Sequence, residues 1–74
     1  MKLTNAWIEE IEINGKGYAV MVLERDKEYE VYLERAGYAM RYMFGLEKQT
    51  NTLQETMETA IANAPDYVYM FDEE

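Results

Sequence analysis

Carboxylates are the side chains of this sequence with the widest range of possible chemistry. The chain carries 15 Asp and Glu residues but no Cys and no His, and its 74 residues include no serine either. The usual nucleophiles, the imidazole base and the soft metal ligands are therefore missing. Carboxylate pairs such as Glu9 with Glu10 or Glu28 with Glu30 could share acid and base roles only in a pocket that desolvates one member. We expect these charges to be solvated and the protein to have no enzymatic activity.

The sequence also contains no motif that is typical of a metal site or of a phosphate-binding loop. Asp66 and the acidic residues 72–74 form the densest group of oxygen ligands, but the spacing and central glycine of an EF-hand loop are absent. Gly15 and Gly17 flank Lys16 with no strand-to-helix transition after them, so they indicate a hairpin and not a phosphate-binding loop. The sequence predicts no metal, no cofactor and no catalytic residue.

The net charge of −8 restricts the class of partner. Residues 49–74 hold six of the acidic residues and none of the seven basic ones. Such a chain repels nucleic acid and anionic membranes and attracts basic surfaces. Seven tyrosines could stack on bases, but the interleaved Lys and Arg of base-stacking platforms are missing. We therefore expect a basic protein partner and no direct nucleic-acid binding.

No segment of the sequence predicts contact with a membrane. The longest stretches without charge are residues 17–23 and 59–65, which are far shorter than the roughly 20 apolar residues of a transmembrane helix. Residues 1–5 are not followed by the apolar core of a secretory signal. We expect a cytoplasmic protein without a membrane anchor.

Alternation of apolar and polar residues along the first two thirds of the chain is typical of a β-meander. Residues that tolerate tight turns punctuate it at Asn14 with Gly15, Asp26 with Lys27, and Ala36 with Gly37. The sequence predicts an α+β fold in a single domain over residues 1–74, in which four antiparallel strands precede a helix and a fifth short strand. The expected elements are strands at about 6–13, 18–25, 28–35 and 38–44, a helix at about 53–63, a strand at about 67–71 and an acidic tail at 72–74.

The turns also predict a strand register. The second turn places Val20 opposite Leu33 and Val22 opposite Val31, so that apolar residues meet. The third turn places Val31 opposite Tyr42, Leu33 opposite Met40 and Tyr29 opposite Phe44. One face of the sheet then carries the expected core residues Ile11, Ile13, Tyr18, Val20, Val22, Tyr29, Val31, Leu33, Met40, Tyr42 and Phe44.

A capping box of Thr52 and Glu55 marks the start of the helix, and Pro65 marks its end. Its apolar face consists of Leu53, Met57, Ala60, Ile61 and Ala64, which recur at helical spacing. The strand at 67–71 could pair antiparallel with the first strand or parallel with the fourth. We favour the first arrangement, because it would protect an otherwise open edge.

One helix cannot cover both faces of the sheet. In the expected register the outer face gathers an apolar patch rimmed by acids, formed by Ile8, Met21, Leu23, Tyr32 and Met43. Exposed apolar area of this kind often marks an interaction surface, and Met and Tyr make adaptable contacts. Ordinary sheet faces also carry scattered apolar residues, and Arg41 between Glu30 and Glu34 could form a simple charge ladder. The sequence alone supports both interpretations.

These features together favour a non-catalytic acidic binding protein that docks on a basic partner, including one that normally holds nucleic acid, and blocks it. In size and charge the chain resembles the small acidic inhibitors of phages and mobile elements, among them nucleic-acid mimics and anti-CRISPR proteins. The partner-binding candidates are Glu55, Glu58, Asp66, Tyr67, Tyr69, Asp72 and Glu73, together with Met21, Leu23, Tyr32 and Met43. The alternative is a homo-oligomeric module, in the simplest case a homodimer, that self-associates through the outer-face patch.

Overall fold

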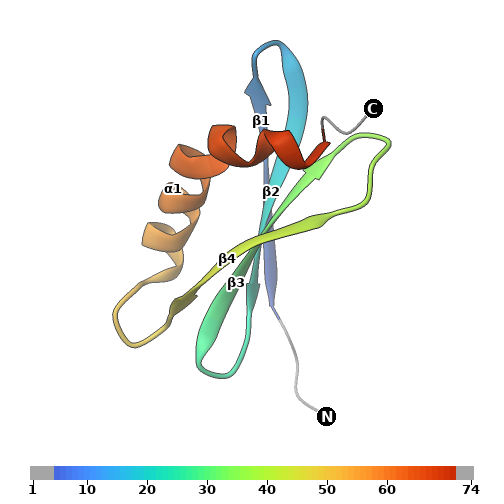
Figure 1. Cartoon of the computed structure of the whole chain (residues 1–74). Helices are drawn as coiled ribbons and strands as arrows, with labels where there is room; N and C mark the ends of the chain where they lie inside the picture. Colours follow the sequence, from blue (N-terminus) through green and yellow to red (C-terminus); the bar gives the residue numbers. More distant parts are fainter. Residues whose placement is uncertain (1–4, 72–74) are drawn as a thin grey trace.

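Four antiparallel strands form one sheet, and a helical segment that follows them packs on one of its faces (Figure 1). The computed structural model describes residues 5–71. Its elements are the strands β1 (Ala6–Ile13), β2 (Lys16–Glu24), β3 (Glu28–Arg35) and β4 (Arg41–Glu47), the α-helix α1 (Leu53–Asn63) and the 3₁₀ helix η1 (Ala64–Phe71). The order β1-β2-β3-β4 and the C-terminal helix confirm the α+β prediction. The expected tail at 72–74 lies outside the described residues.

The first hairpin follows from two residues that accept positive φ angles. Asn14 has a φ of 53° and Gly15 a φ of 79°, and Ile13 pairs with Lys16 across this two-residue turn. Positive φ at both central positions defines the type I′ turn, whose twist matches that of the flanking strands. The turn fixes the register of β1, in which Ile11 lies opposite Tyr18.

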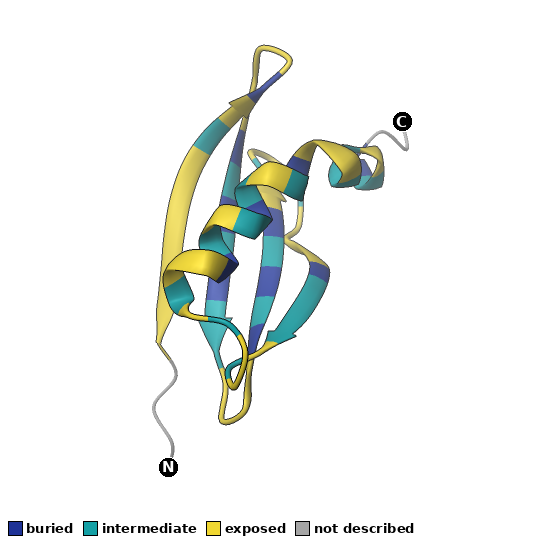
Figure 2. Cartoon of the chain, turned by 90° about the vertical axis from the view of Figure 1, so that its left-hand side faces the viewer, coloured by how far each residue is buried: buried dark blue, intermediate teal, exposed yellow. Residues whose placement is uncertain are grey.

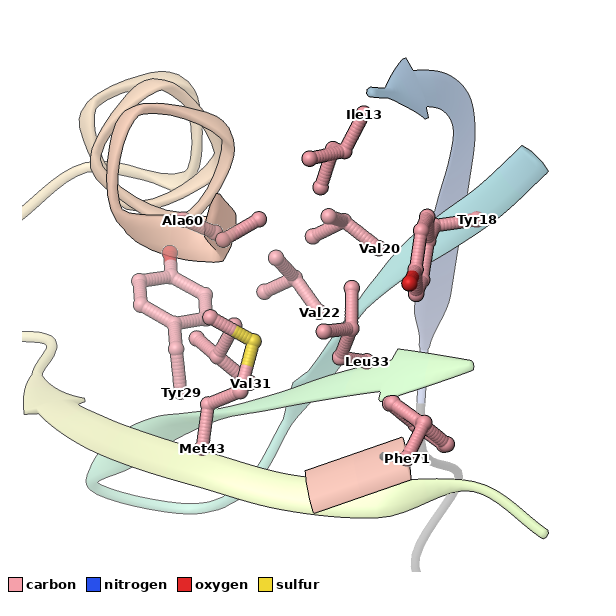
Figure 3. Close-up of a cluster of buried hydrophobic side chains, with 11 residues drawn as sticks. Ile13, Tyr18, Val20, Val22, Tyr29, Val31, Leu33, Met43, Ala60 and Phe71 are labelled. Carbon is pink, nitrogen blue, oxygen red and sulfur yellow. The ribbon is translucent and has the colours of Figure 1, made fainter. Parts of the chain in front are cut away.

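The pairing of β2 with β3 confirms the predicted register, because Val20 lies opposite Leu33 and Val22 opposite Val31. All four side chains are fully buried. Figure 3 shows them pointing into the space between the sheet and α1, together with Ala60 of the helix. Ala60 and Thr56 are the helix residues that are completely buried, while Leu53, Met57 and Ile61 pack around them. The buried Thr56 hydroxyl donates a hydrogen bond to the Thr52 carbonyl oxygen at 2.8 Å, so its burial leaves no polar group unsatisfied.

The register predicted for β3 and β4 is wrong. A turn does form at Gly37, which has a φ of 86°, and the Tyr38 amide donates to the Arg35 carbonyl oxygen at 2.9 Å. The strand nevertheless resumes only at Arg41, so residues 36–40 form a longer loop than the expected two-residue turn. Leu33 therefore pairs with Arg41, Val31 with Phe44 and Tyr29 with Leu46.

A β-bulge in β4 changes which side chains enter the core. Val31 pairs with Phe44 but Tyr32 pairs with Tyr42, which leaves Met43 as an extra residue on β4. An extra residue interrupts the strict alternation of a strand. Met43 is consequently buried in the core with 7% of its surface exposed, and Tyr42 is 53% exposed. The bulge thus corrects two expectations, that Met43 lies on the outer face and that Tyr42 lies in the core. Met40 was also expected in the core, but it lies in the longer loop and is 39% exposed.

The segment expected to form a fifth strand is the 3₁₀ helix η1. Pro65 is the second residue of η1, and its fixed φ angle is compatible with a helical turn. Phe71 is 1% exposed, and its ring lies edge-on to those of Tyr18 and Tyr38, with centroids 6.0 and 5.8 Å apart. The β-propensity of this aromatic and β-branched segment is thus overridden by packing against the sheet face. Neither of the expected fifth-strand pairings occurs, and among the described residues β1 keeps a free edge.

Phe71 is the residue through which η1 contributes most to the core, so its truncation provides a test of the fold. We expect Phe71→Ala to destabilise the protein by about 3–5 kcal/mol, which equals about the whole stability of a domain this small. The exposed Tyr69 is the matched control, and Tyr69→Ala should change the free energy of unfolding by less than about 0.5 kcal/mol. Urea denaturation followed by circular dichroism measures both values. Equal effects would show that η1 does not pack as described.

Candidate interaction surface

The edge strand β1 is the most exposed element of the sheet (Figure 2). Trp7 is 36% exposed and Ile8 63% exposed, and the carboxylates of Glu9, Glu10 and Glu12 are all exposed. No second strand pairs with the outer side of β1 within residues 5–71. Charged residues along such an edge oppose pairing with an unrelated strand that cannot neutralise them.

The hydrogen-bond pattern tells which backbone groups of β1 are free. The Glu24 amide donates to the Asn5 carbonyl oxygen at 2.8 Å, and the closing pair of the hairpin is Ile13 with Lys16. Hydrogen-bonded and non-hydrogen-bonded pairs alternate in an antiparallel ladder, so the odd-numbered residues of β1 bond to β2. The amide and carbonyl groups of the even-numbered residues, at positions 6, 8, 10 and 12, therefore point to the free edge.

A groove of about 490 Å³ lies between β1 and α1. The helix packs mainly on β2 and β3 and leaves this space beside the edge strand. Its lining combines apolar side chains with two carboxylates and consists of Trp7, Ile8, Glu9, Leu53, Gln54, Met57, Glu58 and Ile61. Trp7 and Glu9 lie on the same sheet face as α1, because they pair with the core residues Val22 and Val20. Among the described residues that line the groove there is no Lys or Arg, so its charge is negative.

The two carboxylates expected on the helix have different environments. Glu55 completes the capping box: its carboxylate accepts from the Thr52 amide at 3.0 Å, and the Thr52 hydroxyl accepts from the Glu55 amide at 3.1 Å. Glu55 therefore stabilises the helix start. Glu58 accepts a hydrogen bond from the Gln54 side chain at 3.1 Å, remains exposed and lines the groove. Of this pair, Glu58 is the one whose carboxylate faces the groove.

The remaining candidates of the C-terminal third do not gather into one site. Asp66 and Tyr69 are exposed on η1, whereas the half-buried Tyr67 packs on Phe44 with ring centroids 6.0 Å apart. None of them lines the groove between β1 and α1. Asp72 and Glu73 lie outside the described residues.

We call the face of the sheet opposite α1 the outer sheet face. Its large apolar and aromatic side chains are Ile8, Met21, Leu23, Tyr32 and Tyr42. No helix covers it in the part of the chain that the structure describes (Figure 1). The rings of Tyr32 and Tyr42 meet edge-on, with centroids 5.5 Å apart. A Cβ atom at Gly45 would come within 3.0 Å of the Tyr42 hydroxyl oxygen, so Gly45 provides room for this ring.

Polar contacts among Tyr32, Glu30 and Arg25 lie at one end of the outer sheet face. The Tyr32 hydroxyl donates to a Glu30 carboxylate oxygen at 2.9 Å, and the same oxygen lies 3.2 Å from Nε of Arg25. The hydrogen bond to Glu30 raises the pKa of Tyr32. Arg41 was expected between Glu30 and Glu34, but its guanidinium lies on the core side of the sheet, 5.9 Å from the Phe71 ring centroid. The expected charge ladder through Arg41 is therefore wrong.

The Glu24 carboxylate contacts both Asn5, the residue before β1, and Lys48, the residue after β4. Glu24 accepts a hydrogen bond from the Asn5 side chain at 3.0 Å and forms an ion pair with Lys48 Nζ at 2.7 Å. These contacts lower the pKa of Glu24, the hydrogen bond from Asn5 first and that from Lys48 second. The same pairing with Glu24 raises the pKa of Lys48. The group links Asn5, the residue before β1, to Glu24 at the end of β2.

The groove was not predicted from the sequence, in which Trp7 and Glu9 had been given no place on a face of the first strand. Its signal was the combination of a large apolar residue and a carboxylate at alternate positions facing the helix. The sequence did not specify how far the helix would lie from that strand. The outer sheet face was anticipated at Ile8, Met21, Leu23 and Tyr32, and Tyr42 takes the place expected for Met43.

The structure adds two observations on other kinds of site. Within residues 5–71, no group of three or more acidic residues is arranged to hold a metal ion, and no helix is long and apolar enough to cross a membrane. Comparison of the chain with known protein families, curated proteins and solved structures found no match.

The pKa of Glu24 leads to a prediction about acid stability. A carboxyl group with a lowered pKa in the folded state stabilises the fold above its ordinary value of 4.5, and this contribution is lost as the pH falls through the folded-state pKa. Glu24→Gln should therefore reduce the free energy of unfolding at neutral pH and make no difference at strongly acidic pH. Urea titrations over this pH range measure the effect. The exposed Glu34 gives the control, and Glu34→Gln should not reproduce the difference; a difference that persists in acid would contradict the assignment.

Proposed function

We propose that this protein is a non-catalytic acidic binding protein that docks on a basic protein and blocks it. The observation that carries the proposal is the groove between β1 and α1, in which apolar side chains lie beside Glu9 and Glu58 and no basic residue is present among the described lining. Interfaces with a water-excluded apolar centre and charged groups at its rim bind a partner of opposite charge with both affinity and orientation.

The apolar part of the groove supplies an anchor. Trp7, Met57 and Ile61 are large side chains that are not fully buried and that line the same space. Burial of a partner's apolar group there would remove further surface from water, and Trp is among the residues that most often dominate interface energies. Carboxylates beside such an anchor form stronger ion pairs than isolated surface charges, because the anchor excludes water.

The charge of the chain supports a partner that normally binds nucleic acid. With a net charge of −8, the protein would approach a Lys- and Arg-rich surface with electrostatic attraction, and carboxylates on β1 and α1 would occupy the positions of phosphates. A partner whose basic surface is covered in this way would be unable to bind its nucleic acid.

Charge reversal at the groove tests the proposal. The double variant Glu9→Lys and Glu58→Lys should capture at least about tenfold less of a basic partner from cell lysate than the original protein, since two charge-assisted contacts become repulsive. The variant Glu28→Lys and Glu34→Lys has the same net charge but alters exposed residues outside the groove, so it serves as the matched control. Glu55 is left unchanged because its reversal would break the capping box.

Capture is quantified by mass spectrometry at low and high salt. We expect the specific partner to be lost at high salt, since its binding depends on charge. Equal loss in both double variants would indicate general charge attraction and would remove the groove from the proposal. Capture that is unaffected by either variant would refute binding through acidic side chains.

Self-association through the outer sheet face is the second candidate function, and the uncovered Ile8, Met21 and Tyr42 favour it. A two-fold dimer would place this face against its copy. In that case sedimentation should show a dimer, and Met21→Glu should convert it to a monomer because it buries an unpaired charge. Tyr69→Glu, on η1 and away from this face, should leave the dimer intact. A monomer at high protein concentration would exclude this function.

A further inference from the structure

Within residues 5–71, the unpaired edge of β1 lies beside the groove that Trp7, Ile8 and Glu9 of this strand line together with α1. We propose that the partner inserts an extended basic segment that pairs with β1 as an added antiparallel strand. This inference rests on the proposed function and specifies its binding mode and the chemistry of the segment. Added strands gain affinity from main-chain hydrogen bonds and specificity from side chains at alternate positions.

The backbone of β1 offers the hydrogen-bonding groups for such a strand. Amide and carbonyl groups at positions 6, 8, 10 and 12 point away from β2, as the bond between Asn5 and Glu24 and the alternation of the ladder require. No proline interrupts β1 and its pairing with β2 is regular over all eight residues. The edge is therefore long enough to pair with a strand of ordinary length.

The side chains of β1 define which residues the added strand should carry. On the groove side lie Trp7, Glu9 and Ile11, and on the outer sheet face lie Ile8, Glu10 and Glu12. Directly opposed residues in an antiparallel pair interact, and opposite charges favour pairing. The segment should thus have Lys or Arg opposite Glu9, Glu10 and Glu12, and apolar residues opposite Trp7, Ile8 and Ile11.

Charge also excludes a second copy of this chain as the occupant of the edge. In an antiparallel pair of two β1 strands, both strands would carry Glu9, Glu10 and Glu12 with no basic residue between Ala6 and Ile13 to neutralise them. Like charges on paired strands are destabilising. The edge is therefore selective for a basic strand, and self-association would have to use the outer sheet face.

A designed peptide tests the binding mode without knowledge of the natural partner. The probe is the capped peptide Lys-Val-Lys-Lys-Val-Leu-Thr, whose residues would lie opposite positions 12 to 6 of β1 in that order. Two derivatives carry the same number of N-methyl groups. One is methylated at its third and fifth residues, opposite Glu10 and Ile8, where the amides would face β1; the other is methylated at its fourth and sixth residues, whose amides would face solvent.

Calorimetry should show that methylation facing β1 weakens binding by at least about tenfold relative to methylation facing solvent, because two hydrogen bonds are lost. Hydrogen exchange provides the second measurement. Amides of Ile8 and Glu10, which point to the free edge, should exchange rapidly in the free protein and slowly in the complex, while those of Trp7 and Glu9 should be protected in both states.

The outcomes separate this inference from the proposed function. Equal affinity for the two methylated peptides, or unchanged exchange at Ile8 and Glu10, would mean docking by charge without an added strand, and the proposed function would stand. A scrambled peptide of the same composition that binds as tightly would also overturn the inference. If the unmodified peptide fails to bind, strand addition is refuted, and capture with the groove variants decides the proposed function independently.

Discussion

The rest of the structure depends on how α1 and η1 cover the four-stranded sheet: they pack on its central strands and leave β1 largely exposed. α1 places the fully buried Thr56 and Ala60 against the central strands β2 and β3, and η1 adds Phe71 to the same core. Small side chains at the contact allow the helix to approach these strands closely. The same placement leaves the edge strand β1 largely uncovered and keeps the opposite sheet face free of any helix among residues 5–71. Both candidate surfaces are consequences of this unequal coverage.

The edge strand β1 combines exposed acidic side chains with an ordered backbone. A sheet edge exposes unpaired backbone groups, and the like charges of Glu9, Glu10 and Glu12 oppose the pairing of two copies of this edge. The start of β1 is tied down by the contact of Asn5 with Glu24, which also binds Lys48 after β4. The edge is thus ordered by the sheet and open to a partner of opposite charge. Acidity alone also serves solubility, but acidic side chains along an unpaired, ordered strand edge favour a basic partner in particular.

Local sequence signals predicted much of the fold. The turn at Asn14 and Gly15 accepts positive φ angles, and the capping box of Thr52 and Glu55 starts the helix at Leu53 as expected. Prediction failed where tertiary packing overrode local preference. The bulge at Met43 shifts the alternation of β4, and no local signal separates it from a regular strand. The aromatic segment ending at Phe71 had β-propensity, but it gains more by burying that ring beside Tyr18 and Tyr38.

The sequence by itself determined the composition of the candidate surfaces: the negative charge, the absence of His, Cys and Ser, and the face on which Ile8, Met21 and Tyr32 lie. These properties follow from residue type and from the two-residue period of a strand, which are local. Tertiary structure alone decided that a groove exists between β1 and α1, that Met43 is buried in place of Tyr42, and that no strand within residues 5–71 pairs with the outer edge of β1. The distance between a helix and a strand depends on the packing of the whole core, which no local pattern encodes.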